Sequence, residues 1–381
     1  MIDYDKVIPG KIRDIQPSGI RKFFDIAQQV EGVISLSVGE PDFKTPWAAR
    51  KAAIGVLEKG RTAYTANAGL IQLREEISKY LLNFIHTEYD PNGEIIVTVG
   101  GSEALDLAMR ALIQPGDEVL VPEPSFVCYS PIITVCGGTP VPIVMTEEDK
   151  FKLRADALKA KITPRTKALI LPFPNNPTGS AEVLRGTDIM IISDEIYSEM
   201  TYGGEKHVSI AEIDGMRERT IVVNGFSKTY AMTGWRLGYC AGPKPVMKQM
   251  LKLHQYCIMS SPTVSQYAAI TALTQCRDDV DRMLEEYDMR RRLVVKGFND
   301  MGLTCFEPEG AFYVFPCIKS TGMKSSEFCE KLIYSKKVAV VPGSAFGESG
   351  EGYVRVSYAY SVQHITTALQ RIKEFVEELK K

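Results

Sequence analysis

Short apolar runs alternate with helix-like stretches through the first two thirds of the chain. Six runs rich in Val and Ile have the length and composition of buried strands: residues 94–99, 117–122, 140–144, 167–173, 188–193 and 220–224. A helix-like stretch at 102–113 follows the first run, after two glycines. Strands that are separated by helices usually pair in parallel, so the pattern predicts an α/β region with a mostly parallel sheet covered by helices.

The last third of the chain has a different pattern. A long helical stretch at about 278–302 is expected to link two domains. Strand-like and helix-like segments then follow one another at 311–316, 325–335, 338–343 and 353–359, and an amphipathic helix ends the chain. We therefore expect a large domain at 46–280, a smaller α+β domain at 281–381, and an N-terminal arm at 1–45 that packs with the small domain.

Composition narrows the class of protein. The 381 residues are 45% hydrophobic, enough for a large core, and 45 basic against 47 acidic residues indicate no nucleic-acid partner. There is no 18-residue apolar run and no signal-peptide pattern, so we expect a cytoplasmic protein that does not span a membrane. Eight cysteines without a Cys-x-x-Cys pair, and only four histidines, predict reduced thiols and no metal site.

Polar turns follow several of these strands, and each has a purely structural alternative. Residues 100–103 could bind an anion at a helix N-terminus, or Ser102 could simply cap that helix. Residues 174–179 could present the Asn176 amide to a ligand, or form only a rigid turn. Asp194 could pair with a cationic ring nitrogen, or cap a helix.

The last of these turns contains Lys228 and is followed eight residues later by Arg236. Burial would lower the pKa of the Lys228 amine and make it a nucleophile able to form a Schiff base. Arg236 could donate a charge-assisted hydrogen bond to phosphate, although both residue types usually lie at the surface. Together the turns offer a phosphate cradle, an amide, a carboxylate and an amine, the set that pyridoxal phosphate requires.

Motifs around these turns carry a family resemblance over nearly the whole chain. They are SLSVGEPDF (35–43), AYTANAGLIQLREEI (63–77), NNPTG (175–179), SDEIY (193–197), SKTYAMTGWRLG (227–238) and YVRVSY (353–358). The chain resembles the fold-type-I, pyridoxal-phosphate-dependent class I/II aminotransferases, in the bacterial branch of aspartate, aromatic and N-acetyl-diaminopimelate enzymes. The resemblance implies a mostly parallel seven-stranded sheet, a smaller α+β domain, pyridoxal 5′-phosphate as cofactor, and a homodimer with shared active sites.

The resemblance also implies roles for individual residues. Lys228 matches the lysine that carries the cofactor and moves the substrate proton, and Asp194 matches the carboxylate that pairs with the ring nitrogen. Tyr197 and Asn176 match the donors to the 3′-oxygen of the ring. The remaining matches are Gly101, Ser102, Glu103 and Arg236 at the phosphate, Tyr64 reaching the phosphate of the neighbouring subunit, Phe126 stacked on the ring, and Gly39, Asn176 and Arg355 at the substrate, where Arg355 holds the α-carboxylate.

The chain departs from the family pattern in two places. Gly225 stands where many relatives have a hydroxyl residue that contacts phosphate, and Ser227 is a candidate substitute. The segment between Gly179 and the strand at 188–193 is also shorter than in relatives, which have a helix there that covers the sheet. Because the flanking motifs are intact, we expect a missing stretch of sequence here rather than a true deletion.

The predicted reaction is ping-pong transamination between an L-amino acid and a 2-oxo acid, by default 2-oxoglutarate. A carbon–sulfur β-lyase with the same fold and lysine remains an alternative. A non-enzymatic regulator that binds pyridoxal phosphate is a more distant one, since no DNA-binding module precedes residue 35. Glu103, if it points inward, would disfavour a second substrate carboxylate, so aromatic or other neutral amino donors are expected.

Overall fold

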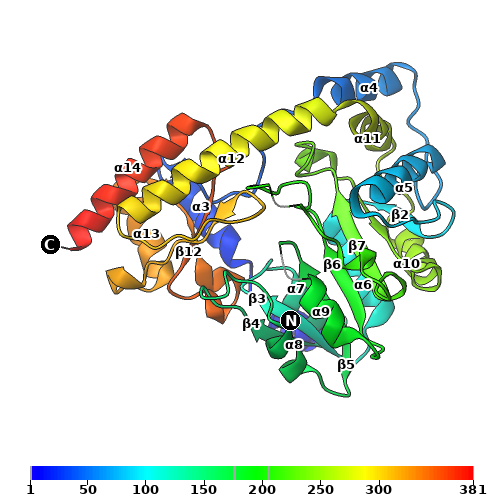
Figure 1. Cartoon of the computed structure of the whole chain (residues 1–381), viewed down its shortest axis with the longest axis horizontal. Helices are drawn as coiled ribbons and strands as arrows, with labels where there is room; N and C mark the ends of the chain where they lie inside the picture. Colours follow the sequence, from blue (N-terminus) through cyan, green and yellow to red (C-terminus); the bar gives the residue numbers. More distant parts are fainter. Residues whose placement is uncertain (1, 175–176, 205, 381) are drawn as a thin grey trace.

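A seven-stranded sheet forms the centre of the computed structural model, which describes residues 2–174, 177–204 and 206–380 (Figure 1). The strand order is β2-β8-β7-β6-β5-β3-β4. The strands span Ile95–Thr98 (β2), Glu118–Glu123 (β3), Thr139–Val144 (β4), Thr166–Pro172 (β5), Met190–Asp194 (β6), Thr220–Gly225 (β7) and Gly238–Ala241 (β8). Strands β3 to β7 pair in parallel, and β8 runs antiparallel to both β2 and β7. The predicted mostly parallel sheet is confirmed.

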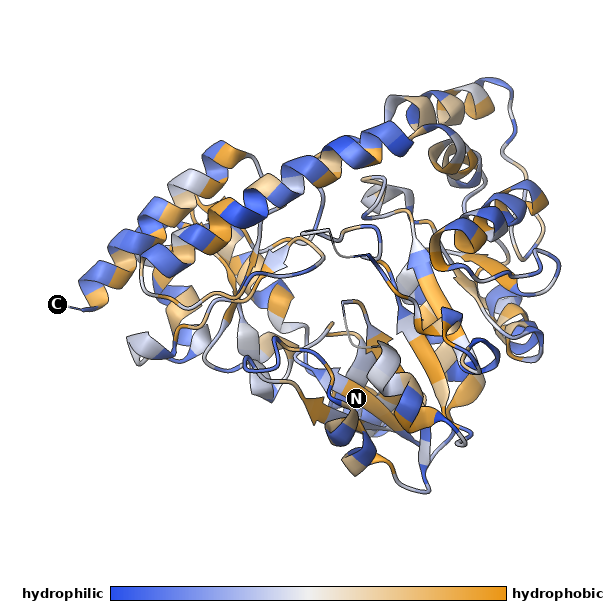
Figure 2. Cartoon of the chain, viewed as in Figure 1, coloured by the Kyte–Doolittle hydropathy of each residue, from blue (hydrophilic) through white to orange (hydrophobic). Residues whose placement is uncertain are grey.

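Helices cover both faces of this sheet. One face packs against α6 (Gly101–Leu112), α7 (Tyr129–Val135) and α10 (Lys244–Cys257), and the other against α8 (Ala155–Lys161) and α9 (Pro177–Leu184). Neighbouring strand residues such as Ile191 and Ile192 therefore enter opposite cores. Burial on both sides explains why the strands are continuous apolar runs, which Figure 2 shows as hydrophobic strands in the lower right half of the view.

Helix α9 accounts for the short segment after Gly179. The chain passes from α9 through a brief turn into β6, and Ala181 and Leu184 of α9 are buried against the sheet. Together with α8, the short segment therefore helps to cover this face of the sheet. A covering helix is thus present at this point of the chain, and the missing stretch of sequence stays a prediction.

A 24-residue helix connects the two ends of the molecule. Helices α4 (Trp47–Glu58), α5 (Ile71–Ile85) and α11 (Thr263–Gln275) pack together beside β2. From α11 the long helix α12 (Arg277–Asp300) crosses to the C-terminal region, where it packs against α14 (Val362–Leu379), as Figure 1 shows. The long helix expected at about 278–302 is thus present.

The C-terminal region contains a small antiparallel sheet with the order β11-β12-β9. The elements of the C-terminal region are β9 (Tyr313–Val314), α13 (Ser325–Lys336), β10 (Val338–Ala339), β11 (Val341–Pro342), β12 (Val354–Ser357) and α14. The N-terminal arm, with α1 (Tyr4–Val7), α2 (Gly10–Arg13), α3 (Gly19–Gln29) and β1 (Ile34–Ser35), joins this region because β1 pairs in parallel with β10. This pairing directs the segment after β1 toward the large sheet. In the described ranges, no helix combines the length and apolar character needed to cross a membrane.

Candidate active site

The candidate site lies at the carboxyl ends of β6 and β7. Asp194 is the last residue of β6, Gly225 is the last of β7, and Lys228 follows three residues later. In a parallel sheet these strand ends share one edge, which is the usual place for a ligand. The segment after β1 and the strands β9 and β12 approach the same edge, as the contacts described below show.

Lys228 is the amine of the site. Its Nζ donates a hydrogen bond of 2.6 Å to the carbonyl of Gly39 and lies 5.8 Å from the centre of the Phe312 ring. Burial lowers the pKa of this amine to about 8, an effect that the nearby cations Arg355 and Arg236 reinforce and that Glu40 opposes. The neutral, nucleophilic form of Lys228 is therefore populated far more near neutral pH than in an ordinary lysine.

Asp194 is a buried carboxylate. Tyr129 donates its hydroxyl to Oδ2 at 2.7 Å, and the Ile196 N–H donates to Oδ1 at 3.3 Å. Burial nevertheless raises the pKa of Asp194 above its ordinary value, because these two donors compensate only part of the lost hydration. A cationic partner would stabilise the ionised form.

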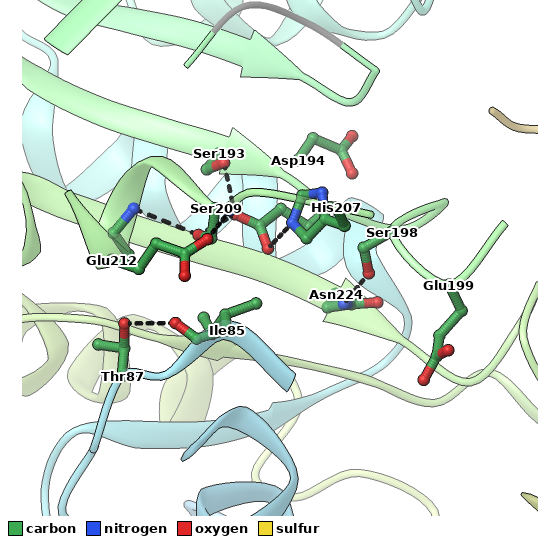
Figure 3. Close-up of polar contacts among 12 residues, drawn as sticks. Ile85, Thr87, Ser193, Asp194, Ser198, Glu199, His207, Ser209, Glu212 and Asn224 are labelled. Carbon is green, nitrogen blue, oxygen red and sulfur yellow. Dashed lines mark hydrogen bonds and ion pairs between the residues drawn. The ribbon is translucent and has the colours of Figure 1, made fainter. Parts of the chain in front are cut away.

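A second buried network supports the strand end that holds Asp194. The Glu195 carboxylate receives the hydroxyls of Ser193 at 2.8 Å and Ser209 at 2.6 Å, and it pairs with Nε2 of His207 at 2.8 Å. Figure 3 shows these contacts beside Asp194. The His207 ring meets Phe173 edge-on at 4.5 Å. The Glu195 carboxylate is thus bonded within this network, although the buried Nδ1 of His207 has no partner among the described residues, and Asp194 is left as the carboxylate of the site.

The turn before α6 is shaped by glycines. Gly100 has φ 78°, and a Cβ at this position would lie 2.8 Å from Nη2 of Arg236. A Cβ on Gly238 would lie 2.6 Å from the Gly101 nitrogen. The N-terminus of α6, the strand β8 and the Arg236 guanidinium therefore meet at one point, where backbone N–H groups and a cation can hold an anion.

The side chains of Ser102 and Glu103 in this turn have different surroundings. Ser102 is exposed in the first turn of α6. The Glu103 carboxylate accepts the Val99 N–H and pairs with Nδ1 of His254 at 2.8 Å. Because Glu103 is held by its own turn and by His254, its carboxylate no longer supplies a reason to exclude a dicarboxylate substrate.

Two aromatic hydroxyls meet at the same edge of the sheet. The Tyr197 and Tyr313 hydroxyl oxygens are 2.9 Å apart. Tyr313 also faces Gly39, where a Cβ would lie 1.8 Å from the Tyr313 hydroxyl oxygen. Gly39 therefore has to be glycine while Tyr313 occupies this position.

Arg355 lies on β12 between two aromatic rings. Its guanidinium carbon is 4.4 Å from the centre of the Tyr313 ring and 4.8 Å from that of Phe346. Nη2 donates to the Ser37 carbonyl at 2.6 Å, while the buried Nε has no partner among the described residues. The arginine is thus fixed in position and still has donors available for a carboxylate.

The other predicted site residues are spread around this centre. Phe126 packs edge-on against Tyr129, with ring centres 5.7 Å apart, next to Asp194. Ser227 is buried, and Tyr64 is 81% exposed on a loop after α4. Asn176 lies outside the described residues.

Comparison with known proteins identifies the family. Residues 31–372 match the family described as aminotransferase class I and II. The chain is 47% identical to an aspartate aminotransferase of Pyrococcus abyssi (96% of this chain, 97% of the relative) and 44% identical to aromatic-amino-acid aminotransferase 2 of Thermococcus litoralis (98% and 99%). The chain belongs to the class I and II aminotransferases.

A solved member of the family has the same fold. The aspartate aminotransferase of Thermus thermophilus, determined with maleate, superposes with a TM-score of 0.91 at 35% identity and covers 96% of this chain and 99% of its own. Class I and II aminotransferases are fold-type-I enzymes of amino acid metabolism that use pyridoxal phosphate. Their activity is therefore that of this chain, a transfer of amino groups.

The residues present fit that cofactor. No salt bridge joins the buried Asp194 to a cation among the described residues, and the α6 N-terminus with Arg236 offers an anion site. At Gly225, a Cβ would lie 3.0 Å from Cα of Gly238, its partner in the strand pair, so the sheet leaves little room for a side chain there.

Sequence reasoning missed two residues of the site. Tyr129 lies in a stretch where the sequence predicts a site role only for Phe126. Tyr313 lies in the segment 311–316, which the pattern predicts only as a strand. One signal for Tyr313 was available in the sequence. Successive side chains of a strand point to opposite faces, and Phe312 is the more apolar of the pair, so Tyr313 is expected to face away from the core.

Proposed function

We propose that this aminotransferase binds pyridoxal 5′-phosphate through Lys228 and moves the amino group of an aromatic or other neutral L-amino acid to 2-oxoglutarate by a ping-pong mechanism. The observation that supports this proposal most is the Lys228 amine, which donates to the Gly39 carbonyl at the same sheet edge as the buried Asp194 carboxylate. Asp194 raises the pKa of that amine and Arg355 lowers it.

Each part of the cofactor would find a partner in this site. Asp194 would hold the ring nitrogen, Tyr197 and Asn176 the 3′-oxygen, and Phe126 one face of the ring. The phosphate would lie at the turn of Gly101 and Ser102, with Arg236, and with Ser227 where Gly225 offers no hydroxyl. Glu103 would contribute its place in that turn, because its carboxylate is already bonded to Val99 and His254.

When bound, the cofactor supplies an aldehyde for imine formation and a protonated ring that withdraws electrons from the substrate α-carbon. Asp194 would keep the ring nitrogen protonated, because a buried carboxylate is stabilised by a cation beside it. The Lys228 amine would take the proton from the α-carbon of the substrate. Its pKa of about 8 suits both uptake and release of that proton.

Arg355 and Gly39 would orient the substrate. The free donors of Arg355 suit a bidentate bond to an α-carboxylate, and the absence of a side chain at Gly39 leaves its carbonyl accessible beside Lys228. The rings of Tyr313 and Phe346, which hold Arg355 between them, give the substrate space an aromatic wall. That wall and the name of the Thermococcus litoralis relative support aromatic or other neutral donors.

A homodimer with shared sites is part of the proposal. Large apolar side chains are exposed on α4 (Trp47, 58%, and Leu57, 57%), on the loop after it (Tyr64, 81%) and in the last turn of α10 (Tyr256, 86%). Hydrogen bonds from Asn67 to the Met259 carbonyl and from Thr263 to the Ala63 carbonyl hold this loop beside the segment after α10. Exposed apolar groups concentrated in this way mark an interaction surface. In a symmetric pair the same surface serves both subunits, and Tyr64 would extend to the phosphate of its neighbour.

A panel of amino donors, each assayed with 2-oxoglutarate, tests the substrate proposal. We expect phenylalanine, tyrosine or another neutral donor to give the highest kcat/KM, with one keto acid formed for each glutamate. A clear preference for aspartate would contradict the proposed donor class. Release of ammonia and pyruvate from cystathionine, without glutamate formation, would indicate a β-lyase instead.

A further inference from the structure

We propose that Tyr313 is a positioning residue that connects the arginine for the substrate carboxylate with the hydroxyl that meets the cofactor ring. The inference rests on the proposed function, because it assigns Tyr313 a part in that same site. Tyr313 is the described side chain that contacts Arg355 through its ring and Tyr197 through its hydroxyl.

The ring of Tyr313 holds Arg355. The guanidinium lies 4.4 Å from the centre of this ring, with Phe346 at 4.8 Å as its second aromatic neighbour. A guanidinium between two ring faces is stabilised by cation–π attraction and keeps its plane, while its N–H groups stay free to donate. Removal of the ring therefore should leave the arginine charged but less well oriented toward a carboxylate.

The hydroxyl of Tyr313 has a separate partner. It lies 2.9 Å from the Tyr197 hydroxyl. It also lies so close to the backbone of Gly39 that no side chain fits at position 39. Gly39 in turn accepts the hydrogen bond from Lys228. The Tyr313 hydroxyl is therefore held by two segments that are far apart in the sequence, and one of them, at Gly39, also bonds the reactive amine.

The direction of the hydrogen bond follows from counting donors. A tyrosine hydroxyl has one hydrogen to donate. If Tyr197 gives its hydrogen to the 3′-oxygen of the cofactor, it can only accept from Tyr313. A hydroxyl that accepts one bond becomes a better donor of the next, so Tyr313 would strengthen the bond from Tyr197 to the cofactor.

Two substitutions separate these roles. Y313F keeps the ring and removes only the hydroxyl, whereas Y313L removes both. Tyr334→Phe is the matched control, because Tyr334 lies on α13 with 60% of its surface exposed. The readouts are the pH midpoint of the absorbance change of the lysine-bound cofactor, and KM and kcat for the best amino donor; thermal melting checks that each variant is folded.

We expect Y313F to raise the pH midpoint by roughly half to one unit, the effect of one lost hydrogen bond, with KM changed by less than about twofold. Y313L should show the same shift and, in addition, a KM raised roughly three- to thirtyfold, because the cation–π contact is lost. The charged groups that face Lys228, namely Glu40, Asp194, Arg236 and Arg355, are unchanged in every variant.

An unshifted midpoint in Y313F, or a KM in Y313L equal to that of the wild type, would overturn the inference. Equal KM values in Y313F and Y313L would overturn it as well, since the ring would then have no part of its own. A wild-type protein that shows no cofactor band would refute the proposed function itself, which distinguishes the two failures.

Discussion

Burial acts in opposite directions on the charges of Lys228 and Asp194. It lowers the pKa of the amine to about 8 and raises the pKa of the carboxylate, because each group loses hydration in its charged form. Neither residue has a full counter-ion among the described side chains. Lys228 donates to a backbone carbonyl, and Asp194 accepts from a hydroxyl and an N–H. Lys228 is thus suited to react with an aldehyde, and Asp194 is suited to bind a cation.

The lowered pKa of Lys228 predicts how cofactor-free protein takes up pyridoxal phosphate. Only the neutral amine attacks, so the uptake rate should rise with pH and level off above about 8, whereas an ordinary lysine would continue to gain up to 10.5. Stopped-flow absorbance over a pH series measures this rate. N-acetyl-lysine methyl amide serves as the control amine, because ionisation of the cofactor itself affects its reaction and that of Lys228 equally. A midpoint equal to that of the control amine would contradict the prediction.

At the scale of elements, the phosphate turn depends on how closely β8 passes the start of α6. Gly238 lies against the backbone of Gly100 and Gly101, and a Cβ there would be 2.6 Å from atoms of both. The antiparallel pairing of β8 with β7 and β2 fixes this contact. The helix N-terminus is therefore positioned by backbone packing as well as by its own sequence.

Gly238→Ala should weaken cofactor binding. The added methyl group would displace the first N–H groups of α6, and we expect the dissociation constant for pyridoxal phosphate to rise about tenfold or more, as for loss of one charge-assisted hydrogen bond. Fluorescence titration measures the constant. Gly234→Ala is the matched control, because a Cβ there meets no atom within 4 Å; similar constants for the two variants would count against this role of β8.

The sequence predicts those elements whose own residues form a recognisable pattern of apolar and polar positions. Strands β2 to β7 were predicted because burial on both faces makes them apolar runs, and α12 because its helical pattern is long. Strand β8 was not, since four residues that include a glycine become a strand only through their partners. In the site, Tyr129 was missed for a similar reason, because its importance comes from Asp194, 65 positions away.

For the whole molecule, the site combines three distant parts of the chain. Gly39 comes from the arm that pairs with β10, Lys228 from the end of the large sheet, and Tyr313 and Arg355 from the C-terminal sheet. In addition, Tyr64 is 81% exposed, and its side chain has no hydrogen bond among the described residues. This arrangement favours a site that is completed by a second copy.

Mixing an inactive variant with an impaired one tests whether sites are shared. Lys228→Ala should lack turnover, and Tyr64→Ala should be impaired at limiting cofactor because the neighbouring phosphate loses a donor. A hybrid dimer has one site with both residues intact, so refolding an equal mixture should restore activity, up to about a quarter of that of the wild type if subunits pair at random. Activity no higher than the mean of the two separate variants would argue for independent sites.

The most direct test of the central claim is to locate the cofactor on the chain. Holoenzyme is reduced with borohydride, which makes the imine linkage permanent, then digested and analysed by peptide mass spectrometry. We predict a single modified peptide that carries the phosphopyridoxyl group on Lys228, and loss of that modification in Lys228→Ala. Modification of another lysine, or a fully active enzyme without cofactor on Lys228, would contradict the proposed role of this residue.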